Sequence, residues 1–180
     1  GDIRWKVDFV KDLETPLPTF GFVSSPLLDG GFLYVQAGAS FLKLDKQTGK
    51  IVWRTLKDDG GMLGSAFSSP ILATVAGKRQ LIVQTRSKLA GVDPQDGQVL
   101  WEHEVPNFRA MNILTPVAVG NSIFTSSYQN KAWSFHVSAQ DNGFQVQEDW
   151  SNNAQGYMST PVVLGDHLYL HLQNQRFTCI

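Results

Sequence analysis

Histidine, aspartate, serine and cysteine side chains of this chain could bind a metal ion or act in catalysis, and their spacing restricts which of these roles is possible. His167 and His171 lie four positions apart in DHLYLH, and histidine is a common metal ligand. On a strand the two positions share a face but lie about 13 Å apart, which is too far for one metal ion. Asp58 and Asp59 precede two glycines and form the one acidic cluster with the flexibility of a calcium loop. A solvated turn is the alternative for this cluster.

The hydroxyl and thiol side chains indicate no nucleophilic site. Ser24-Ser25 and Ser68-Ser69 recur without a histidine at a repeated offset, so we interpret them as turn hydroxyls. Cys179 is the only cysteine, which excludes an internal disulfide. The sequence therefore predicts no catalytic residue, no metal and no cofactor within this chain.

A third polar pattern is the corner LDKQTGKIVW, residues 44–53. Asp45 ends an apolar run, where its side chain can bond the backbone two residues on. Gly49 supplies the positive φ of a tight corner, and Trp53 begins the next strand, where its ring can wedge against a neighbouring unit. The pattern recurs in Asp93, Gly97 and Trp101, and its second half recurs in Gly1 and Trp5. Reactive residues seldom recur identically in every repeat, so we interpret the corner as structural.

A repeat of about 45 residues positions these corners. Its clearest mark is a small hydroxylated residue before proline, in Ser25-Pro26, Ser69-Pro70, Thr115-Pro116 and Thr160-Pro161. Alternating apolar runs and turn residues follow each proline and predict four short antiparallel strands in each unit. Such a unit is a β-propeller blade, since a helical solenoid would need a helical period that is absent.

We therefore predict an all-β propeller of four-stranded antiparallel blades. Three complete blades are expected at about residues 22–56, 67–105 and 113–151, with partial blades at 3–9 and 157–180. The first strand could complete the last blade in a four-blade ring, or the chain could be a piece of a larger ring. A closed four-blade ring would lack the Asp-x-x-Thr half of its fourth corner, which favours a piece of a larger ring. Such a piece has open blade edges, which favour self-association.

The composition of the chain restricts the classes of partner that it can bind. The 180 residues are 42% hydrophobic and 17% charged, with a net charge of −1. The chain can bury a proper core, and it has no basic field for nucleic acid. No stretch approaches the apolar length of a membrane-spanning helix.

The corner also carries a resemblance. Asp45, Thr48, Gly49 and Trp53 form Asp-x-x-Thr-Gly-x-x-x-Trp, which resembles the tryptophan-docking motif of pyrroloquinoline-quinone-type propeller repeats. The segment from Asp93 to Trp101 matches with Asp96 in place of threonine, and the resemblance covers essentially the whole chain. The third unit departs from the motif, because Trp150 comes three residues late after Gly143. This spacing predicts that Trp150 is out of docking register.

The resemblance implies one of two functional classes. Quinoprotein dehydrogenases of this family bind the quinone and calcium on the propeller axis, usually beside an adjacent cysteine pair. Non-catalytic relatives, such as the scaffold of the bacterial outer-membrane assembly machinery, use similar blades for protein contacts. Because the cysteine pair is absent, we expect a non-enzymatic scaffold or protein-binding domain, in the periplasm or otherwise outside the cytoplasm. The alternatives are part of a dehydrogenase whose cofactor and calcium ligands lie outside this chain, or a sensor domain fused to a signalling module.

The connections between blades supply the candidate partner-binding residues. In a propeller the connections from outer strand to next inner strand gather on one face around the axis. Here they carry aromatic and methionine residues together with one arginine, which is typical of a protein-binding surface. Packing between blades is the alternative. The candidate set, called the rim below, is Phe20, Phe22, Met62, Phe67, Phe108, Arg109, Met111, Tyr157 and Met158.

Overall fold

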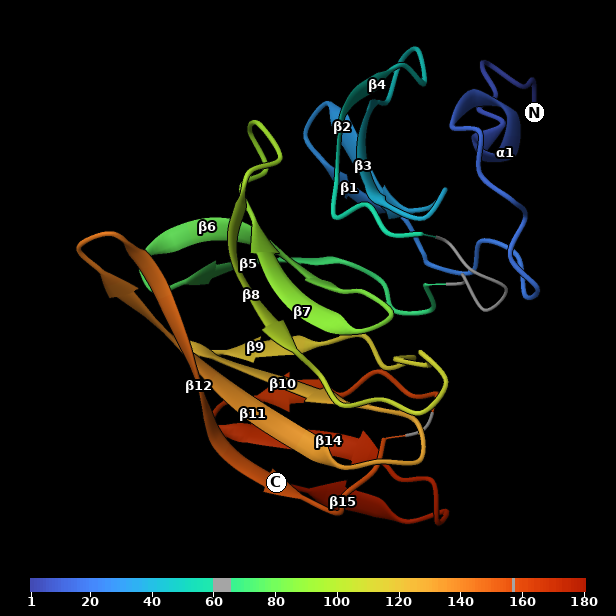
Figure 1. Cartoon of the computed structure of the whole chain (residues 1–180). Helices are drawn as coiled ribbons and strands as arrows, with labels where there is room; N and C mark the ends of the chain where they lie inside the picture. Colours follow the sequence, from blue (N-terminus) through green and yellow to red (C-terminus); the bar gives the residue numbers. More distant parts are fainter. Residues whose placement is uncertain (60–65, 157) are drawn as a thin grey trace.

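The computed structural model describes residues 1–59, 66–156 and 158–180. Apart from one short helix, the regular elements of this part of the chain are strands in four antiparallel sheets (Figure 1). The sheets follow one another along the chain and fan out side by side, and each is one blade, numbered 1 to 4 from the N-terminus. The predicted all-β fold of antiparallel blades is confirmed.

The strands of each blade pair in chain order. Blade 1 contains β1 (Leu27–Asp29), β2 (Phe32–Gln36), β3 (Phe41–Asp45) and β4 (Ile51–Thr55). Blade 2 contains β5 (Ile71–Val75), β6 (Lys78–Gln84), β7 (Lys88–Val92) and β8 (Val99–Glu104). Blade 3 contains β9 (Val117–Val119), β10 (Ser122–Ser126), β11 (Ala132–Gln140) and β12 (Gly143–Asn152). Blade 4 has three described strands, β13 (Val162–Leu164), β14 (His167–His171) and β15 (Phe177–Cys179).

A tight corner joins the third and fourth strands of blades 1 and 2. The Asp45 carboxylate accepts hydrogen bonds from the N–H of Gln47 at 3.0 Å, and from the N–H and the hydroxyl of Thr48, each at 2.9 Å. The bonds from Thr48 hold the pKa of Asp45 below its usual value. Gly49 and Gly97 then turn the chain at φ 73° and 81°, a conformation that strains any residue with a Cβ atom.

Apolar side chains fill the interfaces between blades. Blades 1 and 2 meet through Tyr34, Phe41, Leu81, Val83 and Val92. Blades 2 and 3 meet through a larger cluster that includes Val75, Ile82, Leu89, Trp101, Ile123 and Phe135. Blades 3 and 4 meet through Leu114, Phe124, Ala132, Leu168 and Leu170. Each large side chain buried in this way contributes about 1.5–3 kcal/mol, so the stack of blades is held mainly by these contacts.

The N-terminal segment differs from the strand expected at residues 3–9. The first eight residues have no regular secondary structure, and the helix α1 (Phe9–Asp12) follows them. Phe9 packs against the cluster that contains Val35 and Leu42 of blade 1. A blade strand needs the free edge of a sheet beside it. This segment instead covers the apolar face of blade 1 that blade 2 does not cover.

The hydroxylated residues before proline link successive blades. The backbone N–H of Ser25 donates to Ser69 Oγ at 2.9 Å, and the N–H of Ser69 donates to Thr115 Oγ1 at 3.2 Å. These residues stand just before the first strands of blades 1, 2 and 3. The repeated hydroxyl is therefore a bond between blades as well as a turn residue.

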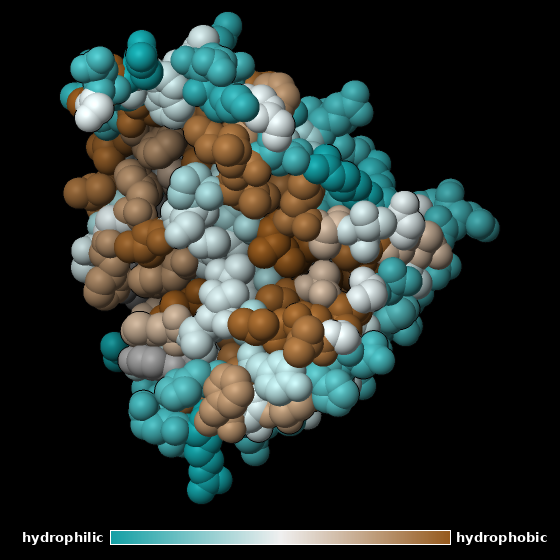
Figure 2. Space-filling view, turned by 180° about the vertical axis from the view of Figure 1, so that it is seen from behind, coloured by the Kyte–Doolittle hydropathy of each residue, from teal (hydrophilic) through white to brown (hydrophobic). Residues whose placement is uncertain are grey.

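Some apolar surface stays exposed. Figure 2 shows brown, apolar side chains over much of the face seen from behind. On blade 4, Val162, Leu164 and Phe177 are 63%, 70% and 71% exposed. No helix in the described ranges is long and apolar enough to cross a membrane.

Candidate functional site

The first two connections bring part of the rim together. The rings of Phe20 and Phe67 lie 5.8 Å apart, although they come from the connections before blade 1 and before blade 2. Phe20 is exposed and Phe67 is half-buried. Phe22 packs edge-on against Phe9 at 5.6 Å, within the cluster on blade 1. Of these three side chains, Phe20 and Phe67 form an accessible aromatic pair, while Phe22 belongs to the apolar cluster on blade 1.

The third connection forms a second aromatic group. The Arg109 guanidinium lies 5.0 Å from the ring centre of Phe108, and this ring lies 6.3 Å from that of Tyr128. The backbone N–H of Tyr128 donates to the carbonyl of Met111 at 3.2 Å. Arg109 and Ala110 both have positive φ, at 52° and 58°, so the backbone is held in an uncommon turn that presents Phe108 outward.

Sequence analysis missed Tyr128, and the other rim residues add one described side chain. Tyr128 stands in the turn between β10 and β11, away from the connections searched in the sequence; its signal is the single aromatic residue in SSYQN. Met158 is exposed. Met62 and Tyr157 lie outside the described residues.

Asp58 and Asp59, the candidate calcium loop, are both paired with an arginine. Arg86 Nε lies 2.9 Å from Asp58 Oδ2, and Arg86 Nη2 lies 2.9 Å from Asp59 Oδ1. Burial alone would lower the pKa of Arg86, but the hydrogen bonds and charges of the two carboxylates raise it. The pair thus ties the connection after blade 1 to the β6–β7 turn of blade 2. Among the described residues, no three or more His, Cys, Asp or Glu side chains are grouped so that they could hold a metal ion.

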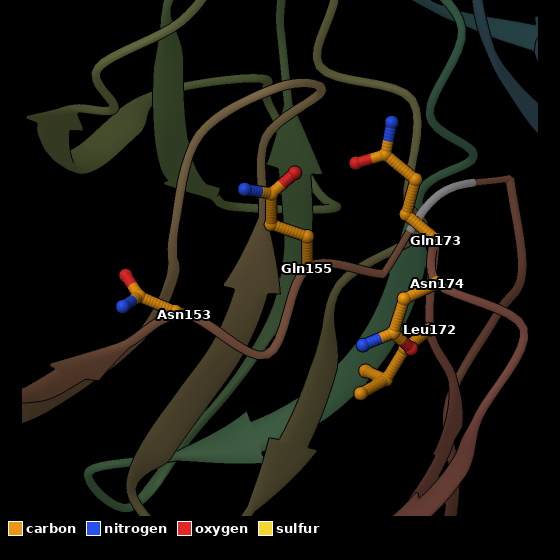
Figure 3. Close-up of a pocket in the computed structure, with 5 residues that line it drawn as sticks. All are labelled: Asn153, Gln155, Leu172, Gln173 and Asn174. Carbon is orange, nitrogen blue, oxygen red and sulfur yellow. The ribbon is translucent and has the colours of Figure 1, made fainter.

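Carboxamides line a hollow of about 390 Å³ at the end of blade 4 (Figure 3). Asn153 and Gln155 come from the connection before blade 4, and Gln173 and Asn174 come from the β14–β15 turn. The N–H of Gln173 donates to the carbonyl of Gln155 at 2.9 Å and fixes the two segments together. Carboxamides both donate and accept hydrogen bonds without charge, so this hollow suits a neutral polar group. The runs NNAQ and QNQ are its sequence signal, which was missed.

The tryptophans of the docking motif reach forward along the chain. The ring of Trp5 packs on Gly49, and its Nε1–H donates to the carbonyl of Lys46 at 2.9 Å. The ring of Trp53 packs on Gly97, where a Cβ atom would lie 2.8 Å from the ring. Each ring therefore contacts the corner of the blade that follows its own segment, and only a glycine leaves room for it.

Trp101 makes a different contact. It is 5% exposed, its Nε1–H donates to Gln80 Oε1 at 2.6 Å, and its ring packs on Gly91 of the same blade. The Asp93 carboxylate, at the corner before it, pairs with Lys78 at 2.7 Å. The hydrogen bond from Lys78 lowers the pKa of Asp93, and burial opposes this.

Trp150 keeps the strand register of the other tryptophans despite its different spacing from the glycine, and its loss of docking register stays a prediction. It pairs with Ser134 as Trp53 pairs with Lys43 and Trp101 with Gly91, and a one-residue bulge precedes each pair. Its ring lies 5.9 Å from Phe124 at 45°, the geometry of Trp53 against Tyr34. The additional residues lie in the longer β11–β12 hairpin, so counting from the glycine misplaced the tryptophan.

Comparison with known proteins agrees with this architecture. The family model described as outer membrane protein assembly factor BamB matches residues 1–180. The chain belongs to the BamB family. The structure is similar to the crystal structure of BamB from Moraxella catarrhalis, with a TM-score of 0.57 and 15% sequence identity. The similarity covers 89% of this chain and 46% of that chain, so the chain spans about half the length of that BamB. No match is found among curated proteins.

The comparison confirms two predictions from sequence. The repeats are those of the pyrroloquinoline-quinone-like family in its outer-membrane assembly branch, and the blades are those of a BamB β-propeller. At 15% identity, the likeness to the Moraxella catarrhalis protein is one of fold.

Proposed function

We propose that the chain is part of a non-enzymatic β-propeller scaffold that binds a protein partner through the rim. The observation that carries the proposal is the group of Phe108, Arg109 and Tyr128, held together on exposed loops. An aromatic pair with an arginine is the composition of an energetic centre in protein interfaces.

Three other rim residues, Phe20, Phe67 and Met158, also support the proposal. Phe20 and Met158 are exposed although the blade interfaces offer apolar surroundings. Phe20 contacts Phe67 across two connections, which gives an anchor of fixed shape. The flexible Met158 side chain can adapt to a partner's apolar side chains.

The family description supports protein contacts and a location outside the cytoplasm. It names an assembly factor for outer membrane proteins. We place this chain in the periplasm on that basis, with a protein as its partner.

Site-specific photo-crosslinking in the producing cells tests the proposal. A photoreactive amino acid replaces Phe108 or Phe20, and in a matched control it replaces Val52, which is exposed on β4. The same protein adduct is expected from both rim positions and not from position 52. Adducts from all three positions, or none from the rim, would contradict a rim interface.

A second measurement tests the non-enzymatic part. The protein is titrated with pyrroloquinoline quinone and calcium. Saturable binding together with dye-linked alcohol or sugar oxidation would overturn the scaffold proposal in favour of a dehydrogenase.

A further inference from the structure

The hairpin of β11 and β12 projects beyond the other strands of blade 3 (Figure 1), because only the first five residues of β11 pair with β10. It turns at Asp141 and Asn142, and Gly143 is the first residue of β12. All three residues are exposed, and Gly143 has φ 130°. We call the projecting part, residues 137–146, the arm. Its tip therefore presents an asparagine directly before a glycine to solvent.

An asparagine before a glycine can lose its side-chain amide in water. The backbone nitrogen of the glycine gives its proton to hydroxide and attacks Cγ of the asparagine. The N–Cγ bond forms, the Cγ–Nδ2 bond breaks, and Nδ2 takes up a proton and leaves as ammonia. Water then opens the resulting succinimide ring at either carbonyl, which gives an aspartyl or an isoaspartyl residue. Glycine favours the attack because it has no Cβ atom to hinder it.

The attack also needs an asparagine side chain that is free to rotate toward the next backbone nitrogen. Hydrogen bonds hold most other asparagine side chains of this chain. Asn121 Oδ1 accepts from the N–H of Ala76 at 2.8 Å, and Asn112 Nδ2 donates to the carbonyl of Arg86 at 3.1 Å. In four further asparagines Oδ1 accepts from a backbone N–H, namely Asn107, Asn130, Asn152 and Asn174.

Asn142 and Asn153 differ from these six. Both are exposed, and among the described residues neither side chain has a hydrogen-bond partner. Alanine follows Asn153, and its methyl group hinders the attack, whereas glycine follows Asn142. Asn142 thus combines a free side chain with the neighbour that reacts most readily.

The arm packs on blade 2 through side chains just after this position. Phe144 and Val146 lie against the cluster between blades 2 and 3, and Gln140 pairs with Gly143 across the turn. An isoaspartyl residue carries one additional carbon atom in its backbone. At Asn142 it would move Gly143 out of its pairing and shift the strand that follows. The contacts of the arm with blade 2 would then weaken.

We propose that Asn142 is a site of spontaneous deamidation, and that its isoaspartyl product loosens the arm from blade 2. The reactant is water, and the change also adds a negative charge beside Asp141. The site shares no residue with the rim and stands at the opposite end of β11 from the turn of Tyr128. It therefore does not depend on the proposed function.

Incubation of the full chain at mildly alkaline pH, followed by proteolysis and mass spectrometry, measures the conversion of each asparagine. We expect the Asn142 peptide to gain the mass of an amide-to-acid exchange and to elute as separate isoaspartyl and aspartyl forms. Two other asparagines are matched controls. Asn121 precedes a small residue, Ser122, but is held, and Asn153 is free but precedes alanine. Both should convert several-fold more slowly than Asn142.

The same incubation in urea separates the effect of structure from that of sequence. Urea breaks the hydrogen bond between Ala76 and Asn121, so the conversion of Asn121 should become several-fold faster, while that of Asn142 changes little. If Asn142 stays intact in the folded chain, or if Asn121 converts there as fast as Asn142, the proposal is overturned.

Hydrogen exchange tests the effect on the arm. The isoaspartyl form is separated by anion exchange and chromatography, and the backbone amides of Phe144 and Val146 should exchange faster in it than in the unchanged chain. Freshly prepared Asn142→Asp has the new charge without the additional backbone carbon, and its exchange should stay unchanged. Equal exchange in all three forms would overturn the loosening of the arm.

Discussion

Replacing a single indole N–H tests the structural account of the tryptophans. Trp101 and Trp53 occupy the same strand register, opposite Gly91 and Lys43, but their Nε1–H groups differ. That of Trp101 donates to Gln80 Oε1 at 2.6 Å, and Gln80 is fully buried. That of Trp53 is buried without a hydrogen-bond partner. Phenylalanine keeps an aromatic ring at either position and removes this donor.

The two variants should therefore differ in stability. In Trp101→Phe, the smaller ring costs about 1–2 kcal/mol, and the Gln80 oxygen left without a donor costs about 1–3 kcal/mol more. In Trp53→Phe, the smaller ring lowers the free energy of unfolding by the same amount, but removal of a buried N–H without a partner raises it by about 1–3 kcal/mol. We expect Trp101→Phe to lower the free energy of unfolding by about 2–5 kcal/mol and Trp53→Phe by about 1 kcal/mol or less.

Urea unfolding followed by circular dichroism measures both variants against the unchanged chain, with midpoints compared at equal slope. Equal losses would show that the hydrogen bond to Gln80 contributes nothing. A larger loss for Trp53→Phe would refute the assignment of the unpaired donor.

Three further predictions concern a corner, a carboxylate and an exposed face. Gly97→Ala should cost at least about 1 kcal/mol more than Gly77→Ala, because both have positive φ but only Gly97 contacts a tryptophan ring; thermal unfolding that shows equal losses would rule this out. The lowered pKa of Asp93 stabilises the fold above its unfolded value of about 3.9 and ceases to do so as the pH falls through the folded value. Asp93→Asn should therefore weaken the dependence of the free energy of unfolding on pH in the acid range. An unchanged pH dependence would argue against this role of Asp93. The chain should self-associate through blade 4, as measured by light scattering. Leu164→Lys should reduce this association, while Leu17→Lys, similarly exposed but in the N-terminal segment, should not; a monomer at every concentration would contradict this.

The repeat made the fold predictable, since proline, glycine and tryptophan positions follow directly from strand and corner geometry. The N-terminal segment was not predictable, because Trp5 docks as its motif suggests while the residues after it cover a face of blade 1. Local sequence cannot show whether an apolar segment extends an edge or covers a face. The strand register of Trp150 could not be read from its distance to Gly143, because the length of a hairpin can change without changing which strand residues pair.

The candidate sites were predictable only in part. Phe108 and Arg109 stand on a connection, where sequence analysis searched, whereas Tyr128 reaches them from a turn about 20 residues later. The hollow at the end of blade 4 combines carboxamides of the connection before that blade with carboxamides of the β14–β15 turn. Polar residues of separate loops give no signal of a common site until their neighbours in space are known.

The hydrogen bonds that join Ser25 to Ser69 and Ser69 to Thr115 bear on how such an array can change during evolution. Along these two links, each unit donates its N–H to the unit after it and accepts with its hydroxyl from the unit before it. A gene duplication that copies one whole unit supplies both groups at once, so the new copy joins on either side without further mutation. A duplication that breaks within a unit would separate the donor from its acceptor. Growth and loss by whole units is therefore the accessible route, and neighbouring units are then free to diverge in the loops and clefts where partners bind.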